Sequence, residues 1–584
     1  MRLAKPRLLA PAATFRPTIT GKSHAVSCGH YLAALAAIRV LDRGGNAIDA
    51  GITAAIALAV LQPDIVSVAG VAPTLIYVKE LGRVVSLAGL GWWPANTDVE
   101  RLREAGGNSI PDGLMRSVIP AAPATHIEAL RRFGTISFEE AALPAIELAR
   151  DGFVVYPLLA NNQLQRTERL RRWESSAHVF LPGGRAPMVG EVFRQPDLAN
   201  TLSAMITAER NAPGSRDAKL VAAHNYFYRG PIAKIIADYH SKYGGFMTRE
   251  DLAAFEVPVE SSIATRYHDY EIHACDVWCQ GISLLQALKI LEGDNLKNLG
   301  HNSPDYLHLV AGALNLAFAD REAYLGDPKF VNVPTLELLS DPYAASQRAR
   351  IDMQRAFAHM PAPGNPLGAT HASIAKPTNL TPAHGATYIA PDTIYCAVMD
   401  QFGNAYSATL SDNTDDTPVI PGTGLAISSR GCQSRLMPGH PSEVKPGKRP
   451  RLTPSPGMVI QDGQPYMCLG TPGGDVQTQA MLQVFLNVTS FGLSLQQAVE
   501  APRVYSANFP NSFAPHDYYP ARLSVDGHMP QGIAEALAAR GHDIELWPTF
   551  SAAGGAVCAV MRDFATGRLH AGADPRREAY AIAW

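Results

Sequence analysis

Apolar residues recur at helical spacing in four long stretches of the chain. These stretches are residues 31–42, 47–61, 138–151 and 306–323. Their periodicity predicts amphipathic helices; Gly44 and Gly45 separate the first two, and Pro63 follows the second. The longest apolar run, residues 50–61, is too short to span a bilayer, so we expect no transmembrane segment.

A different pattern begins after residue 393. Residues 394–399 and 405–410 are rich in β-branched and aromatic residues, and residues 400–404 between them have turn chemistry. This predicts a β-hairpin in which the numbers of paired positions sum to 804, so that Thr393 faces Ser411. Both faces of the two strands are largely apolar, which indicates a sheet that is covered on both sides.

A change of composition marks the residues before this hairpin. Residues 358–392 are rich in Pro, Ala and Gly and contain few large apolar side chains, as in a linker. If the chain is cut between Asp392 and Thr393, the new terminus carries a hydroxyl and a free amine on one residue, a nucleophile with its own base. We therefore predict a large piece, residues 1–392, whose residues 358–392 form a flexible tail, and a small catalytic piece, residues 393–584.

Charge and composition narrow the class of function. The chain has 584 residues, of which 47% are apolar, enough for a large buried core. Its 50 basic and 53 acidic side chains give a net charge of −3, which leaves no electrostatic footprint for nucleic acid. We expect a small-molecule substrate, no nucleic acid and no membrane partner.

The seven cysteines are too few and too scattered for a disulfide framework. Cys275 and Cys279 lack a second pair at zinc-like spacing, so we expect seven reduced thiols. Residues 1–17 contain no apolar core of signal-peptide length. These observations predict a cytoplasmic protein.

Motifs for cofactors and for other hydrolases are absent from the sequence. Residues 21–23, Gly-Lys-Ser, resemble the end of a phosphate-binding loop, but Arg16 occupies the position of its first glycine. The chain contains neither a His-Glu-x-x-His zinc motif nor a Gly-x-Ser-x-Gly nucleophile elbow. We therefore expect no metal and no cofactor.

Several short stretches, in order and at the right spacing, resemble one known family. From about Gly21 to its C-terminus the chain is similar to the gamma-glutamyltransferase family of N-terminal-nucleophile hydrolases. This resemblance implies a four-layer αββα sandwich built from two subunits that are cut from one precursor, and the strands and flanking helices predicted above agree with that fold. The matching stretches are residues 44–50, 145–153, 319–328, 471–474 and 498–503.

The resemblance also implies roles for individual residues. Thr393 falls on the family's catalytic threonine, and Ser411 on a hydroxyl residue that contacts it. Asn413, which strand alternation returns to the face of Ser411, falls on an asparagine that helps to bind substrate. Gly473 and Gly474 fall on the pair whose backbone amides form the oxyanion hole. The residues agree with this last role, because a strand-like run, a glycine turn and a helical pattern follow one another there.

The chain departs from the glutathione-processing members of the family at the γ-glutamyl end of the site. Residues 90–93 contain no arginine to bind a substrate α-carboxylate. Gln433 stands where the family has an aspartate for the α-amino group, and Thr453 lies where a pair of serines is found. The sequence around Thr393 and the Arg430-Gly431 pair look more like the oxamate-amidohydrolase and acylase-like branch.

Four residues are therefore the candidates for binding substrate: Arg430, Gln433, Thr453 and Trp92. Arg430 is suited to an anionic substrate group, because a guanidinium binds a carboxylate through two hydrogen bonds, although a salt bridge would also explain it. Trp92 is a candidate pocket wall, with ordinary core packing as the alternative.

We predict a self-processing threonine amidohydrolase that cleaves a small amide through an acyl-enzyme. The two pieces are expected to stay together as a heterodimer, and further association into a dimer of heterodimers is one of the alternatives. One alternative is a true gamma-glutamyltransferase or glutathione hydrolase with a rebuilt glutamate pocket. A second is an uncut, inactive binding protein.

Overall fold

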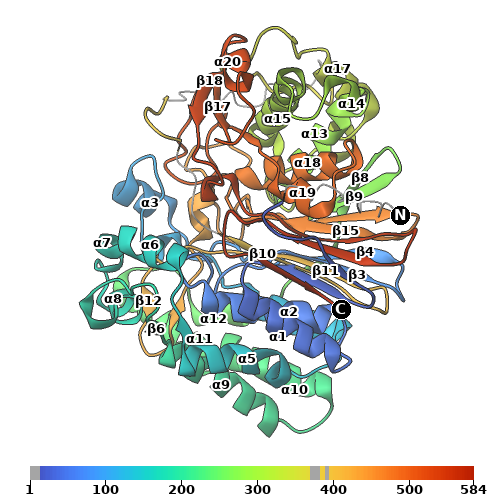
Figure 1. Cartoon of the computed structure of the whole chain (residues 1–584). Coiled ribbons are helices and arrows are strands. Elements are labelled where there is room, and N and C mark those ends of the chain that lie inside the picture. Colours follow the sequence, from blue (N-terminus) through green and yellow to red (C-terminus); the bar gives the residue numbers. More distant parts are fainter. Residues whose placement is uncertain (1–13, 369–381, 388–392) are drawn as a thin grey trace, which may run out of the picture.

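The computed structural model describes residues 14–368, 382–387 and 393–584. Within them, two antiparallel seven-stranded sheets are stacked face to face, and helices cover both outer faces (Figure 1). The first sheet runs in the order β1 (Ile19–Gly21), β20 (Leu569–Ala573), β19 (Cys558–Arg562), β15 (Gln464–Gly470), β14 (Gly457–Gln461), β9 (Tyr270–Ala274) and β8 (Ile263–Tyr267). The second runs β21 (Tyr580–Ala583), β2 (Ala25–Cys28), β10 (Ile394–Met399), β11 (Ala405–Leu410), β3 (Thr74–Val78), β4 (Arg83–Leu87) and β7 (Val259–Ser261).

Each sheet has its own layer of helices. The second sheet is covered, in the lower half of Figure 1, by α1 (Tyr31–Asp42), α2 (Ala47–Leu61), α4 (Ala122–Phe133), α5 (Phe138–Asp151), α9 (Pro196–Asn211), α10 (Arg216–Tyr228), α11 (Pro231–Tyr243) and α12 (Arg249–Ala253). The first sheet is covered by α13 (Gly281–Leu291), α15 (Pro304–Tyr324), α18 (Val476–Thr489) and α19 (Leu495–Glu500). The predicted αββα sandwich is confirmed.

Shorter elements connect and flank these layers. The helices are α3 (Val99–Gly106), α6 (Pro157–Gln165), α7 (Thr167–Leu170), α8 (Glu174–Phe180), α14 (Leu296–Leu299), α16 (Thr335–Leu338), α17 (Asp341–Arg348) and α20 (Ile533–Ala538). The 3₁₀ turns are η1 (Leu114–Arg116), η2 (Pro182–Gly184), η3 (Arg430–Gln433) and η4 (Ala552–Gly554). The strands are β5 (Phe153–Val154), β6 (Val192–Phe193), β12 (Val419–Ile420), β13 (Leu425–Ala426), β16 (Val504–Ser506), β17 (Arg522–Val525) and β18 (Asp543–Leu546).

The sequence patterns located the main elements well. The helices expected at residues 31–42, 47–61 and 138–151 have those bounds, and the helix expected at 306–323 is α15. In the hairpin, Ile394 pairs with Leu410 and Met399 with Ala405, so the predicted register is confirmed.

Strand β10 lies between two apolar layers. Tyr395, Ala397 and Met399 belong to the core between the sheets, whereas Cys396 and Val398 belong to the core beneath the helices. This alternation follows from the two-residue period of a strand. All six residues of β10 are buried, so the hairpin is covered on both faces, as predicted.

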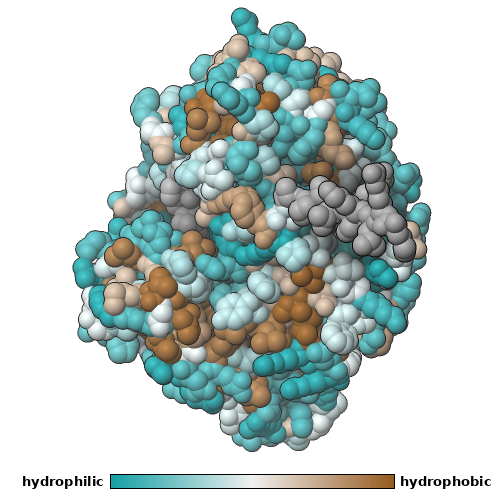
Figure 2. All heavy atoms as spheres, viewed as in Figure 1, coloured by the Kyte–Doolittle hydropathy of each residue, from teal (hydrophilic) through white to brown (hydrophobic). Residues whose placement is uncertain are grey.

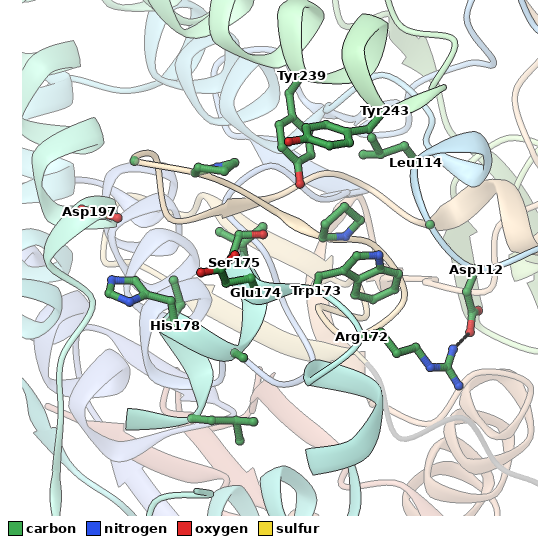
Figure 3. Close-up of a pocket in the computed structure, with 18 of the residues that line it drawn as sticks. Asp112, Leu114, Arg172, Trp173, Glu174, Ser175, His178, Asp197, Tyr239 and Tyr243 are labelled. Carbon is green, nitrogen blue, oxygen red and sulfur yellow. Dashed lines mark hydrogen bonds and ion pairs between the residues drawn. The ribbon is translucent and has the colours of Figure 1, made fainter. Parts of the chain in front are cut away.

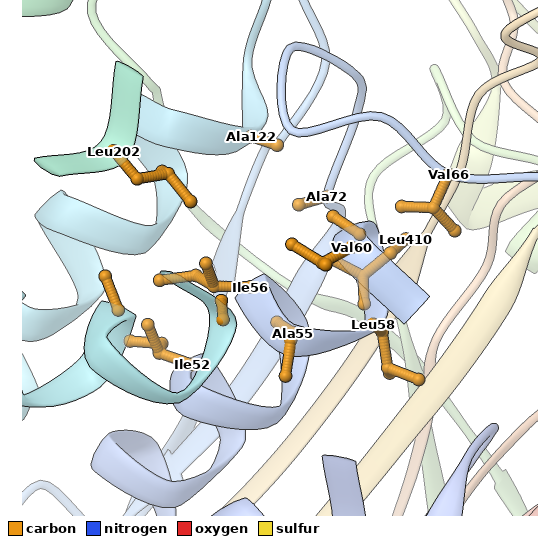
Figure 4. Packing of buried hydrophobic residues seen from close by; sticks show 14 of the residues in the cluster. Ile52, Ala55, Ile56, Leu58, Val60, Val66, Ala72, Ala122, Leu202 and Leu410 are labelled. Carbon is orange, nitrogen blue, oxygen red and sulfur yellow. The ribbon is translucent and has the colours of Figure 1, made fainter. Parts of the chain in front are cut away.

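Helix α2 is the centre of the helical layer below the second sheet. All fifteen of its residues are buried, and Ile52, Ile56, Leu58 and Val60 pack among neighbours from other helices and from β11 (Figure 4). Gly51 lies against the ring of Tyr406, where an added Cβ would come within 2.2 Å of a ring carbon. The helix therefore packs directly on the hairpin that follows Thr393.

The described parts of the predicted tail, residues 358–392, are held in place. The backbone N–H of Met360 donates to the Tyr518 hydroxyl at 2.8 Å, and the N–H of Ala383 donates to the Tyr518 carbonyl at 2.8 Å. These bonds connect residues before the predicted cut to Tyr518, which follows it. The flexibility of the tail stays a prediction. Asp392 lies outside the described residues.

All seven cysteines are free and buried. Figure 2 shows hydrophilic side chains over most of one face, with apolar side chains gathered in separate patches. In the part of the chain that the structure describes, no helix is long and apolar enough to cross a membrane.

Candidate active site

Thr393 lies immediately before β10 and is fully buried. Its backbone N–H donates to the carbonyl of Ile65 at 3.2 Å. Its φ angle is +77°, a left-handed conformation that is a real outlier for a β-branched residue. Backbone strain of this kind costs on the order of 1 to 3 kcal/mol and is concentrated at functional sites. No residue pattern around Thr393 predicts this conformation.

A chain of hydrogen bonds leads from Thr393 to a buried arginine. The Thr393 Oγ1 lies 2.6 Å from the Ser411 Oγ, as the hairpin register predicted. Arg430, at the start of η3, donates from Nη2 to the same Ser411 Oγ at 2.6 Å. Three polar side chains are therefore aligned inside the protein.

The arginine is held by two further neighbours. Its Nε lies 3.9 Å from a carboxylate oxygen of Asp412, and its guanidinium carbon lies 5.3 Å from the ring centre of Phe513. Asp412 accepts hydrogen bonds from the backbone N–H and the hydroxyl of Ser429 at 2.8 and 2.6 Å. Burial raises the pKa of Asp412, and the charge of Arg430 opposes that rise.

The glycine pair forms the turn that leads into α18. Gly473 and Gly474 have φ angles of +115° and +57°, which glycine adopts without strain. Their carbonyls accept from the N–H groups of Val476 and Gln477 in the first turn of the helix. Among the described residues, neither glycine N–H donates a hydrogen bond. Two unused amides at a helix N-terminus are suited to a developing negative charge.

Gln477 connects this helix to Thr393 and was not among the residues predicted from the sequence. The residue is fully buried in the first turn of α18. Its side-chain Nε2 lies 3.5 Å from the Thr393 Oγ1, and its Oε1 accepts from the N–H of Ser455 at 3.0 Å. A glutamine one turn after the glycine pair, within an otherwise buried helix, was the available signal.

Gln433 and Thr453, two of the predicted substrate-binding residues, bind each other. The Gln433 Nε2 donates to the Thr453 Oγ1 at 2.7 Å, and the Thr453 N–H donates to the Gln433 Oε1 at 3.1 Å. Both side chains are buried. Gln433 ends η3, which begins with Arg430, so the structure groups these three residues. Their contact with substrate stays a prediction.

Asn413 does not continue the strand geometry. Strand β11 ends at Leu410, so the alternation that was expected to return Asn413 to the face of Ser411 does not apply. The Asn413 Nδ2 instead donates to Asp416 at 3.3 Å, and its Oδ1 has no hydrogen-bond partner in the described part of the chain. Its predicted role in binding substrate stays a prediction.

Trp92 lies in a different environment from the other candidates. Its ring packs against Phe255, with ring centres 4.9 Å apart. The neighbouring Trp93, rather than Trp92, reaches η3: its indole N–H donates to Ser434 at 3.0 Å, and its ring leaves no room for a Cβ on Gly431. Trp92 also lines a small pocket of about 460 Å³ with Thr248 and Asp251, so its predicted role as a pocket wall stays a prediction.

A pocket of about 1250 Å³ opens beside this region (Figure 3). Trp173, Tyr239 and Tyr243 line it. Its wall also includes Gly113, whose N–H donates to the carbonyl of Asp416 at 2.8 Å. The pocket thus borders the segment that carries Asp416, and Thr393 is not among the residues that line it.

Between the pocket and Asn413, polar side chains form a network of ion pairs. Asp416 binds Arg116 at 2.9 Å as well as Arg169 and Asn413. Arg116 also binds Asp112 at 2.8 Å, which lines the pocket. In the described residues, no group of three His, Cys, Asp or Glu side chains could hold a metal ion.

The stacked sheets, the buried threonine and the glycine turn define an N-terminal-nucleophile hydrolase fold. The family description "Gamma-glutamyltranspeptidase" matches residues 33–584. The chain belongs to this family of hydrolases and transferases.

Three known proteins illustrate the similarity. An Acylase ACY 1 proenzyme from Pseudomonas sp. (strain SE83) is 31% identical over 540 residues, covering 90% of this chain and 88% of the relative. A glutathione hydrolase proenzyme from Bacillus subtilis (strain 168) is 28% identical, covering 97% of this chain and 92% of the relative. The crystal structure of a cephalosporin acylase from Bacillus halodurans matches with a TM-score of 0.85 at 30% identity, covering 100% of this chain and 99% of the other.

Proposed function

We propose that this protein is a self-processing amidohydrolase in which Thr393 is the nucleophile. The observation that carries the proposal is the position of the Thr393 hydroxyl, which lies 2.6 Å from Ser411 at the start of β10. The unused amides of Gly473 and Gly474 support it as an oxyanion hole. The proenzyme names of the relatives support a cut precursor.

In maturation, the Thr393 Oγ1 attacks the carbonyl carbon of Asp392. The peptide C–N bond breaks as an ester C–O bond forms, and the Thr393 nitrogen takes up a proton and becomes an amine. Water then hydrolyses the ester, which leaves a carboxylate on Asp392 and restores the hydroxyl. The left-handed conformation of Thr393 raises the energy of the uncut chain, which favours this reaction.

In turnover, the same hydroxyl attacks a substrate amide, and the new α-amine of Thr393 takes the proton. An α-amine has an ordinary pKa of about 7.7 to 8.0, so it can act as a base near neutral pH. The amides of Gly473 and Gly474 hold the oxyanion, and losing one such donor typically costs about 2.7 to 4 kcal/mol of barrier. The amine of the substrate leaves, and water or another amine releases the acyl group.

The strand order supports a stable heterodimer after the cut. Strand β10 belongs to the small piece but lies between β2 of the large piece and β11 of the small piece. Strand β11 in turn pairs with β3 of the large piece. Separating the pieces would break both sheets and expose their cores, so we expect the pieces to remain together.

The substrate is proposed to be an amide with an acyl group other than γ-glutamyl. Gln433 and Thr453 satisfy each other's hydrogen bonds, and neither carries the charge needed to bind a glutamate α-amino group. The acylase relative at 31% identity and the cephalosporin acylase structure support the same direction. A γ-glutamyl enzyme with a rebuilt pocket is the competing reading.

Intact-mass measurement of the purified protein tests the proposal. We expect two pieces of 392 and 192 residues, with the second beginning at Thr393. The Thr393→Ala variant should give one mass. A wild-type chain that never splits would favour the uncut binding protein instead. Turnover of a γ-glutamyl anilide against a panel of short and acylase-type amides then separates the two enzyme readings.

A further inference from the structure

We propose that Arg430 is a positioning residue that acts on Thr393 through Ser411, and that it does not bind an anionic group of the substrate. The inference rests on the proposed function of Thr393. It assigns a role to the buried arginine that requires no charge on the substrate.

The hydrogen-bond chemistry of the three side chains sets the direction of the interaction. A guanidinium carries only donors, so the Ser411 Oγ is the acceptor in its 2.6 Å contact with Arg430. The positive charge of the arginine polarises the Ser411 hydroxyl and makes it a better donor. The Thr393 Oγ1, 2.6 Å away, is then the atom that receives this donor as its own charge develops.

The proton balance of the step is simple. As Thr393 attacks, its hydroxyl proton moves to its α-amine, and a C–O bond forms to the substrate carbonyl carbon. Ser411 keeps its proton throughout and donates a hydrogen bond to the oxygen of Thr393. Arg430 keeps its charge, because a guanidinium is not deprotonated in proteins. No further reactant is needed.

Burial makes the charge effective. Arg430, Ser411 and Thr393 are each 0% exposed, so water does not screen the interaction. The Asp412 carboxylate approaches the guanidinium Nε no closer than 3.9 Å, and it accepts two hydrogen bonds from Ser429 instead. The guanidinium instead directs an Nη2 N–H toward Ser411 at 2.6 Å inside the protein.

A substrate carboxylate would meet obstacles at the same guanidinium. Binding through two hydrogen bonds needs two adjacent N–H groups, and one of the two N–H groups of Nη2 is already used by Ser411. The Nε side faces the negative charge of Asp412, and the ring of Phe513 lies within 5.3 Å of the guanidinium carbon. The contacts favour an internal role.

Self-cleavage of the precursor provides the first test, because no substrate is bound at that stage. We expect Arg430→Met to slow the appearance of the two pieces by about 10- to 100-fold and Arg430→Lys to restore part of the rate. Wild-type rates with Arg430→Met would overturn the inference. If the wild-type chain itself never splits, the proposed function fails and not this assignment alone.

Steady-state kinetics on a matched pair of amides, one neutral and one anionic, provide the second test. In cleaved enzyme, the variants should lower kcat by a similar factor on both amides and change KM by less than about threefold. A loss confined to KM of the anionic amide would show that Arg430 binds substrate. Adding Ser411→Ala to Arg430→Met should cost little beyond Ser411→Ala alone, because both changes interrupt one path.

The pH profile separates this role from a purely structural one. Removing a buried positive charge near Thr393 raises the pKa of its α-amine, so the acid limb of kcat/KM should move to higher pH in Arg430→Met and much less in Arg430→Lys. Arg503→Lys is the control for loss of a buried arginine contact, since Arg503 binds Asp574 at 2.6 Å. It should lower Tm and leave the pH profile in place. An unmoved acid limb in Arg430→Met would overturn the inference.

Discussion

Helices α2 and α18 cover opposite sheets of the sandwich and are both almost entirely buried, yet they differ in chemistry. Every residue of α2 is buried, and its side chains are apolar apart from Asp49 and Thr53 near its start. In α18 all residues except Thr489 are buried, and four of them are amides: Gln477, Gln479, Gln483 and Asn487. A buried amide costs free energy unless it is hydrogen-bonded, so each one marks a specific contact.

Two of these amides bind both backbone groups of a residue in β16, as a neighbouring strand would. Gln479 accepts from the N–H of Ser506 at 2.9 Å and donates to its carbonyl at 3.0 Å. Gln483 does the same with Val504 at 2.9 and 2.8 Å. Gln477 breaks the pattern, because one half of its amide binds the backbone of Ser455 and the other half faces the Thr393 hydroxyl. If Thr393 is the nucleophile, as proposed, Gln477 is the buried amide next to the chemistry, whereas Gln479 and Gln483 bind backbone groups of β16.

The largest expected effect is at Thr393, the residue that Gln477 of α18 approaches. Thr393→Ala removes the proposed nucleophile, so self-cleavage should stop and amide turnover should fall by about 10³-fold or more. Thr393→Ser keeps a hydroxyl and should retain part of both. Gel analysis and turnover assays measure the two effects. An alanine variant that still cleaves itself and still hydrolyses amides would show that Thr393 is not the nucleophile.

The second effect compares two hydroxyl contacts in one hairpin. Ser411 and Ser407 are both fully buried, and each lies 2.6 Å from a partner hydroxyl, Thr393 and Tyr395 respectively. Ser411→Ala should slow cleavage and turnover by roughly 10²-fold, which corresponds to an activation barrier about 2.7 kcal/mol higher. Ser407→Ala should cost about 1 to 3 kcal/mol of stability and leave kcat within twofold. Equal kinetic losses in the two variants would contradict the assignment.

The sequence predicted the parts of this site that depend on local pattern. Strand periodicity was enough to pair Thr393 with Ser411, because a hairpin register follows from its turn. It was not enough for Asn413, since the strand ends at Leu410 and the chain then turns. Gln477 was missed because its partner Thr393 lies 84 positions away, a contact that only the packing of α18 on the sheets creates.

The third effect tests the amides within α18 itself. Gln477→Ala removes a donor next to the nucleophile and should lower kcat by about tenfold or less, because at 3.5 Å the contact is long. Gln483→Ala instead leaves the Val504 backbone groups without partners, so it should cost about 1 to 3 kcal/mol of stability with kcat unchanged. Denaturation curves and kcat, measured on both variants, show whether each amide contributes to turnover or to stability.

The smallest effect on activity is expected in α2, although the effect on stability there is large. Leu58 is fully buried in the layer shown in Figure 4, and Leu58→Ala should cost about 2 to 5 kcal/mol of unfolding free energy. Around Leu58, α2 meets the hairpin through packing, and its hydrogen bond to the hairpin, from the N–H of Ala47 to the Asp400 carboxylate at 2.8 Å, lies at the other end of the helix. The folded fraction of this variant should therefore cleave itself and turn over substrate at nearly the wild-type rate. Activity normalised to folded protein is the measurement. A fall in kcat as large as that of Gln477→Ala would mean that packing beneath β10 and β11 sets the geometry of Thr393 as strongly as the amide that faces it.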